Sequence, residues 1–241
     1  MKKLLLASTL LLNACYNPNT LVFHSTAFDA EKAITTYIEH DVSVHYIVEE
    51  NGNVILLTPE EEQAAHAGQS YWRGYDRINP RSIGIEILQP TLGQSKFSEK
   101  QIEAVIELSK KIIKKYNIKP TMIVGHSDIA PRRKPDPGKC FPWKKLSEEE
   151  IGIWYYLPDA KKVADISVEE MLFAIGYDTK DLAAAQYAFA RRYMPELVEI
   201  NDVIYTIENP YPKNFDASNN KKFVEILKAV YFRYSQPQCF R

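Results

Sequence analysis

The sequence predicts an α/β fold, in which a mixed central β-sheet is flanked by helices and followed by a small all-α domain. Between residues 21 and 143, short β-rich runs alternate with amphipathic helical runs. Two of the β-rich runs are joined at Asn51-Gly52, the dipeptide typical of tight hairpins. After about residue 160, helical periodicity continues without comparable strand alternation. A hairpin plus strands separated by helices favours a mixed sheet with helices packed on it.

The first fifteen residues predict an export signal. Two lysines precede an apolar run from Leu4 to Leu12, which is too short to span a bilayer but suits a signal-peptide core. Cys15 at its end resembles the bacterial lipobox cysteine, which is acylated and becomes the mature N-terminus. An uncleaved helix stays open, as does signal removal without lipidation, because Asn13 is less usual at its place. We expect an exported, periplasmic bacterial protein, anchored to the outer membrane where Cys15 is acylated.

The other cysteines and the segment after Cys15 give two further expectations. Residues 16–20 alone separate Cys15 from the first strand, and five extended residues reach about 17 Å. An anchored protein would therefore stand close to the lipid headgroups. Cys140 and Cys239 could form a disulfide in an exported protein, or remain two unpaired buried thiols.

The elements of the first part follow one another in a regular order. Residues 21–27 read as a buried strand, and residues 29–40 as a helix capped by Asp29. The hairpin follows, and then a strand at 81–88. A helix begins after Ser98, which forms a capping box with Gln101. One face of that helix carries Ile102, Val105, Ile106, Ile112, Ile113 and Tyr116. The final strand, 121–126, ends at His126.

Three helices are predicted in the second part. They occupy residues 167–177, 179–194 and 216–234, and we place a boundary near residue 160. The predicted organisation is a signal peptide at 1–15, a catalytic domain at 16–158 and a helical domain at 159–241. The formal net charge of −1 gives no electrostatic reason to expect nucleic acid as a partner.

Histidines and one proline-rich loop suggest a metal site. The chain has five histidines, and a catalytic zinc needs neutral imidazole and carboxylate ligands. His24 lies in the first strand and His126 ends another, so adjacent strands could bring both rings to one sheet edge. The stiff loop at 131–137 could then return Asp136 as a third ligand. Spacing alone leaves a structural or surface role open for each histidine.

Five stretches together resemble a known family. They occur in the order VFHSTA, SVHYIVEENGNV, HAGQSYWRG, INPRSIGIEIL and IVGHSDIAPRRKPDPGKCFPW. As a set they resemble the zinc-dependent N-acetylmuramoyl-L-alanine amidases of the type-2 amidase family, and most of all its lipoprotein branch. That resemblance covers roughly residues 20–145 and implies the fold of phage T7-type lysozyme and peptidoglycan-recognition proteins. The stretch TKDLAAAQYAFARRYMPE resembles, more faintly, a helical peptidoglycan-binding domain.

The resemblance implies a role for each matching residue. It assigns zinc to His24, His126 and Asp136, and catalytic roles to Glu86 and Lys134. Strand alternation independently places Glu86 on one face with Gly84, where the missing side chain leaves space for a substrate. Glu86 would act as general base, and the ammonium of Lys134 would stabilise the oxyanion. An ion-paired Glu86 and a solvated Lys134 are the structural alternatives.

Further residues are candidate substrate contacts. These are His45, for which we favour a structural or hydrogen-bonding role near the cleft, His66 as a groove residue, Trp72 as an aromatic that stacks on a sugar or packs in the protein, and Arg132 as one of several loop cations. The expected activity is zinc-dependent hydrolysis of the amide between N-acetylmuramic acid and L-alanine, by a monomer acting on peptidoglycan or muropeptides. A non-catalytic peptidoglycan-recognition module and a zinc peptidase acting on stem peptides are the alternatives.

Overall fold

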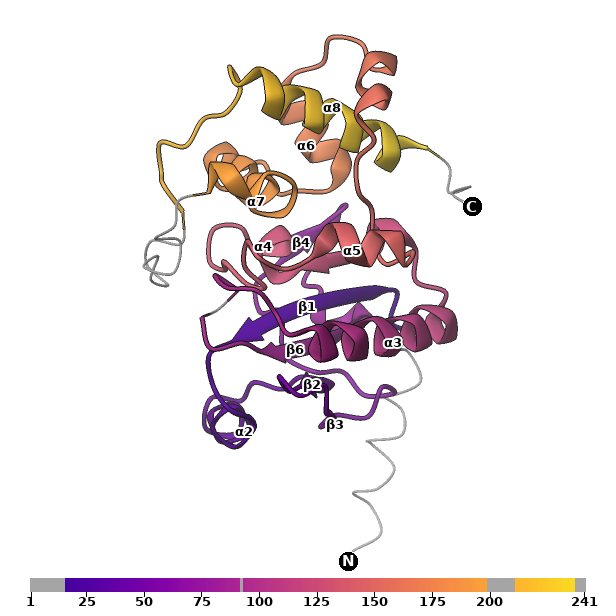
Figure 1. Ribbon diagram of the computed structural model, residues 1–241, viewed down its shortest axis with the longest axis vertical. Coiled ribbons are helices and arrows are strands. Elements are labelled where there is room, and N and C mark those ends of the chain that lie inside the picture. Colours follow the sequence, from indigo (N-terminus) through magenta and orange to yellow (C-terminus); the bar gives the residue numbers. More distant parts are fainter. Residues whose placement is uncertain (1–15, 92, 199–210, 237–241) are drawn as a thin grey trace, which may run out of the picture.

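The computed structural model describes residues 16–91, 93–198 and 211–236 (Figure 1). A five-stranded sheet has the order β3-β2-β6-β1-β7. Strand β1 runs parallel to both β6 and β7, β2 runs parallel to β6, and β3 is antiparallel to β2. The predicted mixed sheet is therefore confirmed.

The strands are β1 (Thr20–Thr26), β2 (Tyr46–Val48), β3 (Val54–Leu56), β6 (Ser82–Leu88) and β7 (Ile123–Gly125), with a separate small hairpin of β4 (Tyr71–Trp72) and β5 (Tyr75–Asp76). The helices are α2 (Ala30–Glu39), α3 (Glu99–Tyr116), α4 (His126–Ile129), α5 (Trp143–Glu148), α6 (Val168–Ile175), α7 (Leu182–Tyr193) and α8 (Lys221–Ser235). Short 3-10 turns occupy Asn79–Arg81, Pro120–Met122, Leu157–Lys162 and Pro195–Leu197.

The central strands β1 and β6 position two of the candidate site residues, His24 and Glu86. Every residue of β6 is buried, as expected of a parallel strand with neighbours on both sides. Most of its residues are apolar, and Glu86 is the one acid among them. The parallel register sets His24 of β1 directly beside Glu86. Because side chains in register point to the same face, the sheet brings an imidazole and a carboxyl together.

Local capping and turn signals explain where several elements begin. Asp29 accepts from the Lys32 amide at the start of α2, as predicted. At Asn51-Gly52 the predicted hairpin forms, with Gly52 in the left-handed region at φ 89°. Ser98 caps α3, but its expected capping box is incomplete. The side chain of Gln101 instead donates to the carbonyls of Val48 and Leu88, which ties α3 to the sheet.

The three predicted C-terminal helices form, and they pack against the first part of the chain (Figure 1). Trp72 meets Tyr177 edge-on at 5.1 Å between ring centroids. Buried residues on both sides of the boundary near residue 160 belong to one continuous core. The helical part is therefore joined to the sheet by a packed apolar interface.

The segment before β1 is docked on the protein. The Tyr16 hydroxyl donates to the Ser82 carbonyl at 2.6 Å, and the Asn19 amide donates to the Arg81 carbonyl at 2.8 Å. Pro18 is buried. These residues are held by β6 and the turn before it, so the segment reaches less far than the roughly 17 Å of a fully extended chain.

Cys15 and Cys239 lie outside the described residues. The thiol of Cys140 contacts the Gln94 carbonyl at 3.2 Å, and its pairing with Cys239 stays a prediction. Among the described residues, no helix combines the length and the apolar character that crossing a membrane requires.

Candidate metal centre and catalytic site

Three predicted ligands converge at the carboxyl ends of β1 and β7. His24 lies on β1, and His126 opens α4 immediately after β7, one residue beyond the strand that it was expected to end. The two Nδ1 atoms are 2.9 Å apart. Oδ2 of Asp136 lies 3.0 Å from Nδ1 of His126 and 3.4 Å from Nδ1 of His24. All three residues are buried.

The outer partners of the two rings fix their tautomers. Nε2 of His126 faces the Ala67 carbonyl at 3.3 Å, an acceptor only, so this nitrogen carries the proton. Nε2 of His24 lies 2.9 Å from Nδ1 of His66. Nε2 of His66 faces the Ser82 hydroxyl at 3.1 Å, and that hydroxyl donates to the Ile78 carbonyl at 2.8 Å.

One assignment of protons satisfies this whole chain of hydrogen bonds. Because Ser82 donates onward, its oxygen accepts from Nε2 of His66, whose Nδ1 then accepts from Nε2 of His24. Nδ1 of His24 is thereby left without a proton, like Nδ1 of His126. Two imidazole lone pairs and one carboxylate oxygen therefore meet at a single point.

Three converging acceptors need a cation between them. Ligand atoms around a tetrahedral zinc, with bonds of about 2.0–2.2 Å, lie about 3.3 Å apart, close to the observed separations. Two neutral imidazoles and a carboxylate also leave a fourth position for substrate or water, as catalytic zinc sites do. The cluster thus fits a divalent metal ion by geometry and by donor chemistry.

Charge and burial act together on the ligands. Burial, and then the neighbouring His126, lower the pKa of His24 to about 4, so this ring is neutral at pH 7. Burial alone would raise the pKa of Asp136, but His126 and His24 hold it well below its usual range. His24 and Asp136 are thus in the protonation states that metal binding requires.

The loop that carries Asp136 is fixed by its backbone. The Ser127 amide donates to the Asp136 carbonyl at 2.8 Å, and the Ser25 hydroxyl donates to the Pro137 carbonyl at 3.3 Å. Gly93, at φ 74°, crosses so closely that a Cβ there would lie 2.0 Å from the Pro137 oxygen. The proline-stiffened loop is therefore clamped between α4, β1 and the turn at Gly93.

Glu86 stands beside the cluster as a buried acid. Burial, and then the charge of Asp136, raise its pKa to about 8, while Tyr37 and Lys134 act in the opposite direction. The charge of Lys134 also lowers the pKa of His24, so this ammonium acts electrostatically on both groups. A carboxyl with a pKa near the working pH suits general acid–base catalysis.

Tyr37 is a residue that the sequence reasoning missed. Its buried hydroxyl has no hydrogen-bond partner among the described residues. Burial, and then the neighbouring Glu86, raise its pKa, so this hydroxyl belongs to the surroundings of Glu86. Tyr37 follows the buried Ala33 by four residues on α2, and that spacing is the signal that could have identified it.

The candidate substrate contacts lie in different places. Trp72 is fully buried and donates to the Thr121 carbonyl at 2.9 Å, so the prediction that it stacks on a sugar is wrong. His45 is also fully buried, accepts from the Gly84 amide at 3.1 Å and is not a substrate contact. His66 lies behind His24 and fills the space beside Gly84, where a Cβ would be 2.6 Å from its ring. The expected substrate space there is therefore occupied.

Arg132 is the one candidate contact that reaches a pocket. Its guanidinium pairs with Asp178 at 2.6 Å. The pocket, of about 330 Å³, lies between the 129–133 loop, the β4 region and the helical part. The guanidinium of the neighbouring Arg133 instead donates hydrogen bonds to the backbone carbonyls of Ala67 and Gln69.

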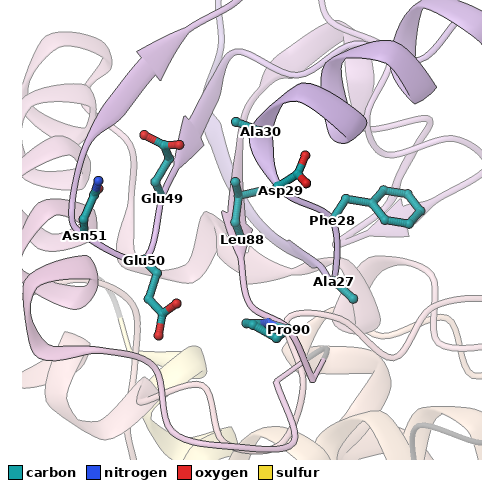
Figure 2. A pocket seen from close by; sticks show the side chains of 9 residues that line it. All are labelled: Ala27, Phe28, Asp29, Ala30, Glu49, Glu50, Asn51, Leu88 and Pro90. Atoms are coloured by element: carbon teal, nitrogen blue, oxygen red, sulfur yellow. The ribbon is translucent and has the colours of Figure 1, made fainter.

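A larger hollow, of about 630 Å³, lies at the carboxyl ends of β1 and β6. Figure 2 shows residues 27–30 on one side, residues 49–51 of the hairpin on the other, and Leu88 with Pro90 between them. Leu88 follows Glu86 by two residues on the same face of β6. The hollow therefore lies further along the same face of β6 than Glu86, with an apolar and acidic lining.

Comparisons with known proteins agree with this site. The family profile described as N-acetylmuramoyl-L-alanine amidase matches residues 15–139. The chain is 41% identical to N-acetylmuramoyl-L-alanine amidase AmiD of Escherichia coli K12, over 66% of this chain and 67% of that protein. It is 36% identical to 1,6-anhydro-N-acetylmuramyl-L-alanine amidase AmpD of Enterobacter cloacae, over 44% of this chain and 55% of AmpD.

Solved structures extend the likeness through the helical part. The complex of E. coli AmiD with anhydro-N-acetylmuramic acid-L-Ala-D-gamma-Glu-L-Lys superposes with a TM-score of 0.73 at 33% identity, covering 92% of this chain and 91% of that one. AmpDh3 of Pseudomonas aeruginosa with anhydromuramic pentapeptide gives 0.72 at 28%, covering 90% and 92%. The profile match and the AmiD likeness together establish that the chain belongs to the N-acetylmuramoyl-L-alanine amidase family.

Proposed function

We propose that this protein hydrolyses the amide bond between N-acetylmuramic acid and L-alanine in peptidoglycan or muropeptides, using one zinc ion held by His24, His126 and Asp136. The observation that carries the proposal is the convergence of three unprotonated ligand atoms beside a buried acid whose pKa is raised to about 8. The family relationship supplies the bond that is cut.

Zinc, when bound, supplies Lewis acidity toward the scissile carbonyl and makes water a better nucleophile. Glu86 accepts the proton of the attacking water and returns it to the leaving amino group of L-alanine, so that the amine departs neutral. Burial keeps this carboxyl out of bulk water, which lets one group both take and give the proton. The Tyr37 hydroxyl, which has no hydrogen-bond partner among the described residues, is available to donate to this carboxyl.

Lys134 stabilises the negative charge that develops on the carbonyl oxygen. Its ammonium lies close enough to His24 and Glu86 to lower the pKa of both. In the part of the chain that the structure describes, Lys134 is in no ion pair, whereas Arg132 pairs with Asp178. An ammonium that is not already neutralised by a protein carboxylate is available to a developing oxyanion.

Two alternatives are disfavoured by specific features. A recognition module without turnover needs neither a complete ligand set nor a buried acid of raised pKa, and this site has both. A peptidase acting within the stem peptide would need the same metal centre, so only the position of the cut distinguishes it. By its resemblance, the helical part is assigned to peptidoglycan binding.

Digestion of purified anhydro-muropeptides and intact muropeptides, followed by mass spectrometry, tests the proposal. We expect a free muramic acid sugar and an intact stem peptide that begins with L-alanine. Chelation should abolish this activity and zinc should restore it. Cleavage within the stem peptide would identify a peptidase, and binding without any product would identify a recognition module.

The location of the enzyme is a second part of the proposal. We infer export to the periplasm, with attachment to the outer membrane through acylated Cys15. Because Tyr16 is docked on the sheet, an acylated Cys15 would hold the protein against the lipid surface. Such an enzyme would act on membrane-proximal glycan or on released fragments. Mass spectrometry of the mature N-terminus checks this, and a start elsewhere or an unmodified Cys15 removes the anchor.

A further inference from the structure

The helical part reaches the metal site through one buried carboxylate, Asp128. This residue lies on α4, two positions after His126, and is 1% exposed. Its Oδ2 accepts from the Gly125 amide at 2.8 Å and from Nη1 of Arg192 at 2.7 Å. Its Oδ1 accepts from the Tyr177 hydroxyl at 2.8 Å. Arg192 and Tyr177 both belong to the helical part.

Arg192 is itself held rigidly at this junction. The side chain is 3% exposed, and its guanidinium lies 3.9 Å from the centre of the Trp143 ring. Its second terminal nitrogen donates to the carbonyl of Ile123, the first residue of β7, at 3.2 Å. One arginine from α7 therefore fixes both the start of β7 and the helix that follows it.

Helix α4 in turn orients two of the three metal ligands. His126 is its first residue, and the Ser127 amide holds the Asp136 carbonyl at 2.8 Å. A helix of four residues has little stability of its own, so its orientation depends on tertiary contacts. Asp128 gives α4 two such contacts with the helical part, the ion pair with Arg192 and the hydrogen bond from Tyr177.

We propose that the helical part is a positioning element of the metal site, in which Tyr177 and Arg192 act through Asp128 to hold His126 and Asp136 in ligand geometry. This inference rests on the proposed zinc centre. It gives residues 159–198 a role in metal affinity, separate from any role in binding the cell wall. Tyr177, Arg192 and Asp128 are positioning residues, because none of them contacts the ligand atoms.

The most direct test is Tyr177→Phe in the full chain, with Tyr234→Phe as the matched control. Both tyrosines are buried in the helical part, but among the described residues the Tyr234 hydroxyl contacts that of Tyr193, at 3.5 Å, and not Asp128. Zinc affinity is measured by competition with a chromophoric chelator, and folding of the metal-free proteins by circular dichroism. We expect Tyr177→Phe to weaken zinc binding about three- to ten-fold, somewhat less than a direct partner of a ligand would, while Tyr234→Phe leaves it unchanged.

A second variant removes both charges of the ion pair. Asp128→Asn with Arg192→Met replaces a buried pair by neutral groups of similar size, an exchange that proteins often tolerate. We expect zinc affinity to fall about ten-fold or more in the folded double variant. If that variant does not fold, Tyr177→Phe decides the question.

The outcomes separate this inference from the proposed function. Equal zinc affinity in wild type and Tyr177→Phe, with only the unfolding temperature lowered, would show that the contact is merely structural and would overturn the inference. A wild-type protein that binds no zinc would overturn the proposed metal centre, and this inference with it.

Discussion

Two pairs of histidines lie within a few ångströms of one another and do different things. In the metal-site pair, His24 and His126, one nitrogen of each ring points at Asp136 and the other is bound to the protein. In the supporting pair, His45 and His66, protein groups occupy both nitrogens. All four rings are buried, so burial does not separate the pairs.

What separates them is the partner of each nitrogen. A ring whose second nitrogen meets two other acceptors cannot be satisfied without a cation, whereas a ring between a donor and an acceptor is complete. The metal site is thus built in two layers, with His66 setting the tautomer of His24 from behind. Such outer partners orient ligands and raise their basicity.

The largest effect is expected when one histidine of the metal-site pair is removed. His126→Ala should lose both bound zinc and turnover, with activity falling at least about a thousand-fold, because the Lewis acid is lost. His45→Gln, in the supporting pair, should retain stoichiometric zinc and lose about 1–3 kcal/mol of stability through its buried hydrogen bonds. Zinc content by plasma mass spectrometry and urea unfolding measure the two. Stoichiometric zinc in His126→Ala would show that the ligand set is wrong.

Removing the acid should separate chemistry from metal binding. Glu86→Gln keeps the shape of the side chain but cannot accept a proton, so kcat should fall about 10²–10⁴-fold. Zinc content should be unchanged, because Glu86 is not a ligand. Muropeptide hydrolysis and zinc analysis on the same sample check this. Loss of zinc together with activity would move Glu86 into the ligand set.

The cation beside the cluster should contribute less than the acid. Lys134→Met should lower kcat about 10²–10³-fold with zinc retained, because oxyanion stabilisation is lost. The exposed Lys144, which pairs only with Glu148, provides the control, and Lys144→Met should not change kcat. Steady-state kinetics measure both variants. An effect confined to KM would assign Lys134 to substrate binding instead.

A substitution in the supporting pair should weaken metal binding without abolishing it. His66→Gln should weaken zinc binding about 10–100-fold while leaving a folded protein, because the tautomer of His24 is no longer fixed. Ser82→Ala, one step further from the metal, should have a smaller effect in the same direction. Chelator competition measures the two affinities. A wild-type affinity in His66→Gln would reduce its role to packing beside Gly84.

The last prediction concerns stability and pH rather than zinc or turnover. The folded-state pKa of Glu86, raised to about 8, lies above its usual value of 4.5, so the folded, metal-free protein holds an extra proton between these values. Its stability contribution is therefore lost as pH rises through this window. Relative to Glu86→Gln, the metal-free wild type should lose about 3 kcal/mol between pH 5 and 8. Parallel unfolding curves at all pH values would contradict this.

Local signals predicted much of the fold. The hairpin at Asn51-Gly52 and the caps at Asp29 and Ser98 depend on neighbouring residues, so the sequence carries them directly. The partner of Gln101 could not be predicted, because it is the sheet rather than the helix end. The docked Tyr16 likewise depends on Ser82, which is remote in the chain.

In the candidate site, too, some residues could be predicted from the sequence and others could not. The family resemblance pointed to His24, His126 and Asp136, which the fold brings together. The misplaced residues, Trp72 and His66, are those whose surroundings come from distant segments. Trp72 is covered by Tyr177 of the helical part, and His66 is enclosed by β1 and β6. Periodicity reports which face a residue takes, but not what covers that face.

The central claim is that His24, His126 and Asp136 bind a single zinc ion. The most direct measurement is a crystal structure of the zinc-loaded protein, with an anomalous difference map recorded at the zinc edge. We predict one peak, about 2.0–2.2 Å from Nδ1 of both histidines and from a carboxylate oxygen of Asp136. A peak elsewhere, or a zinc ion bound through a cysteine sulfur, would contradict the account.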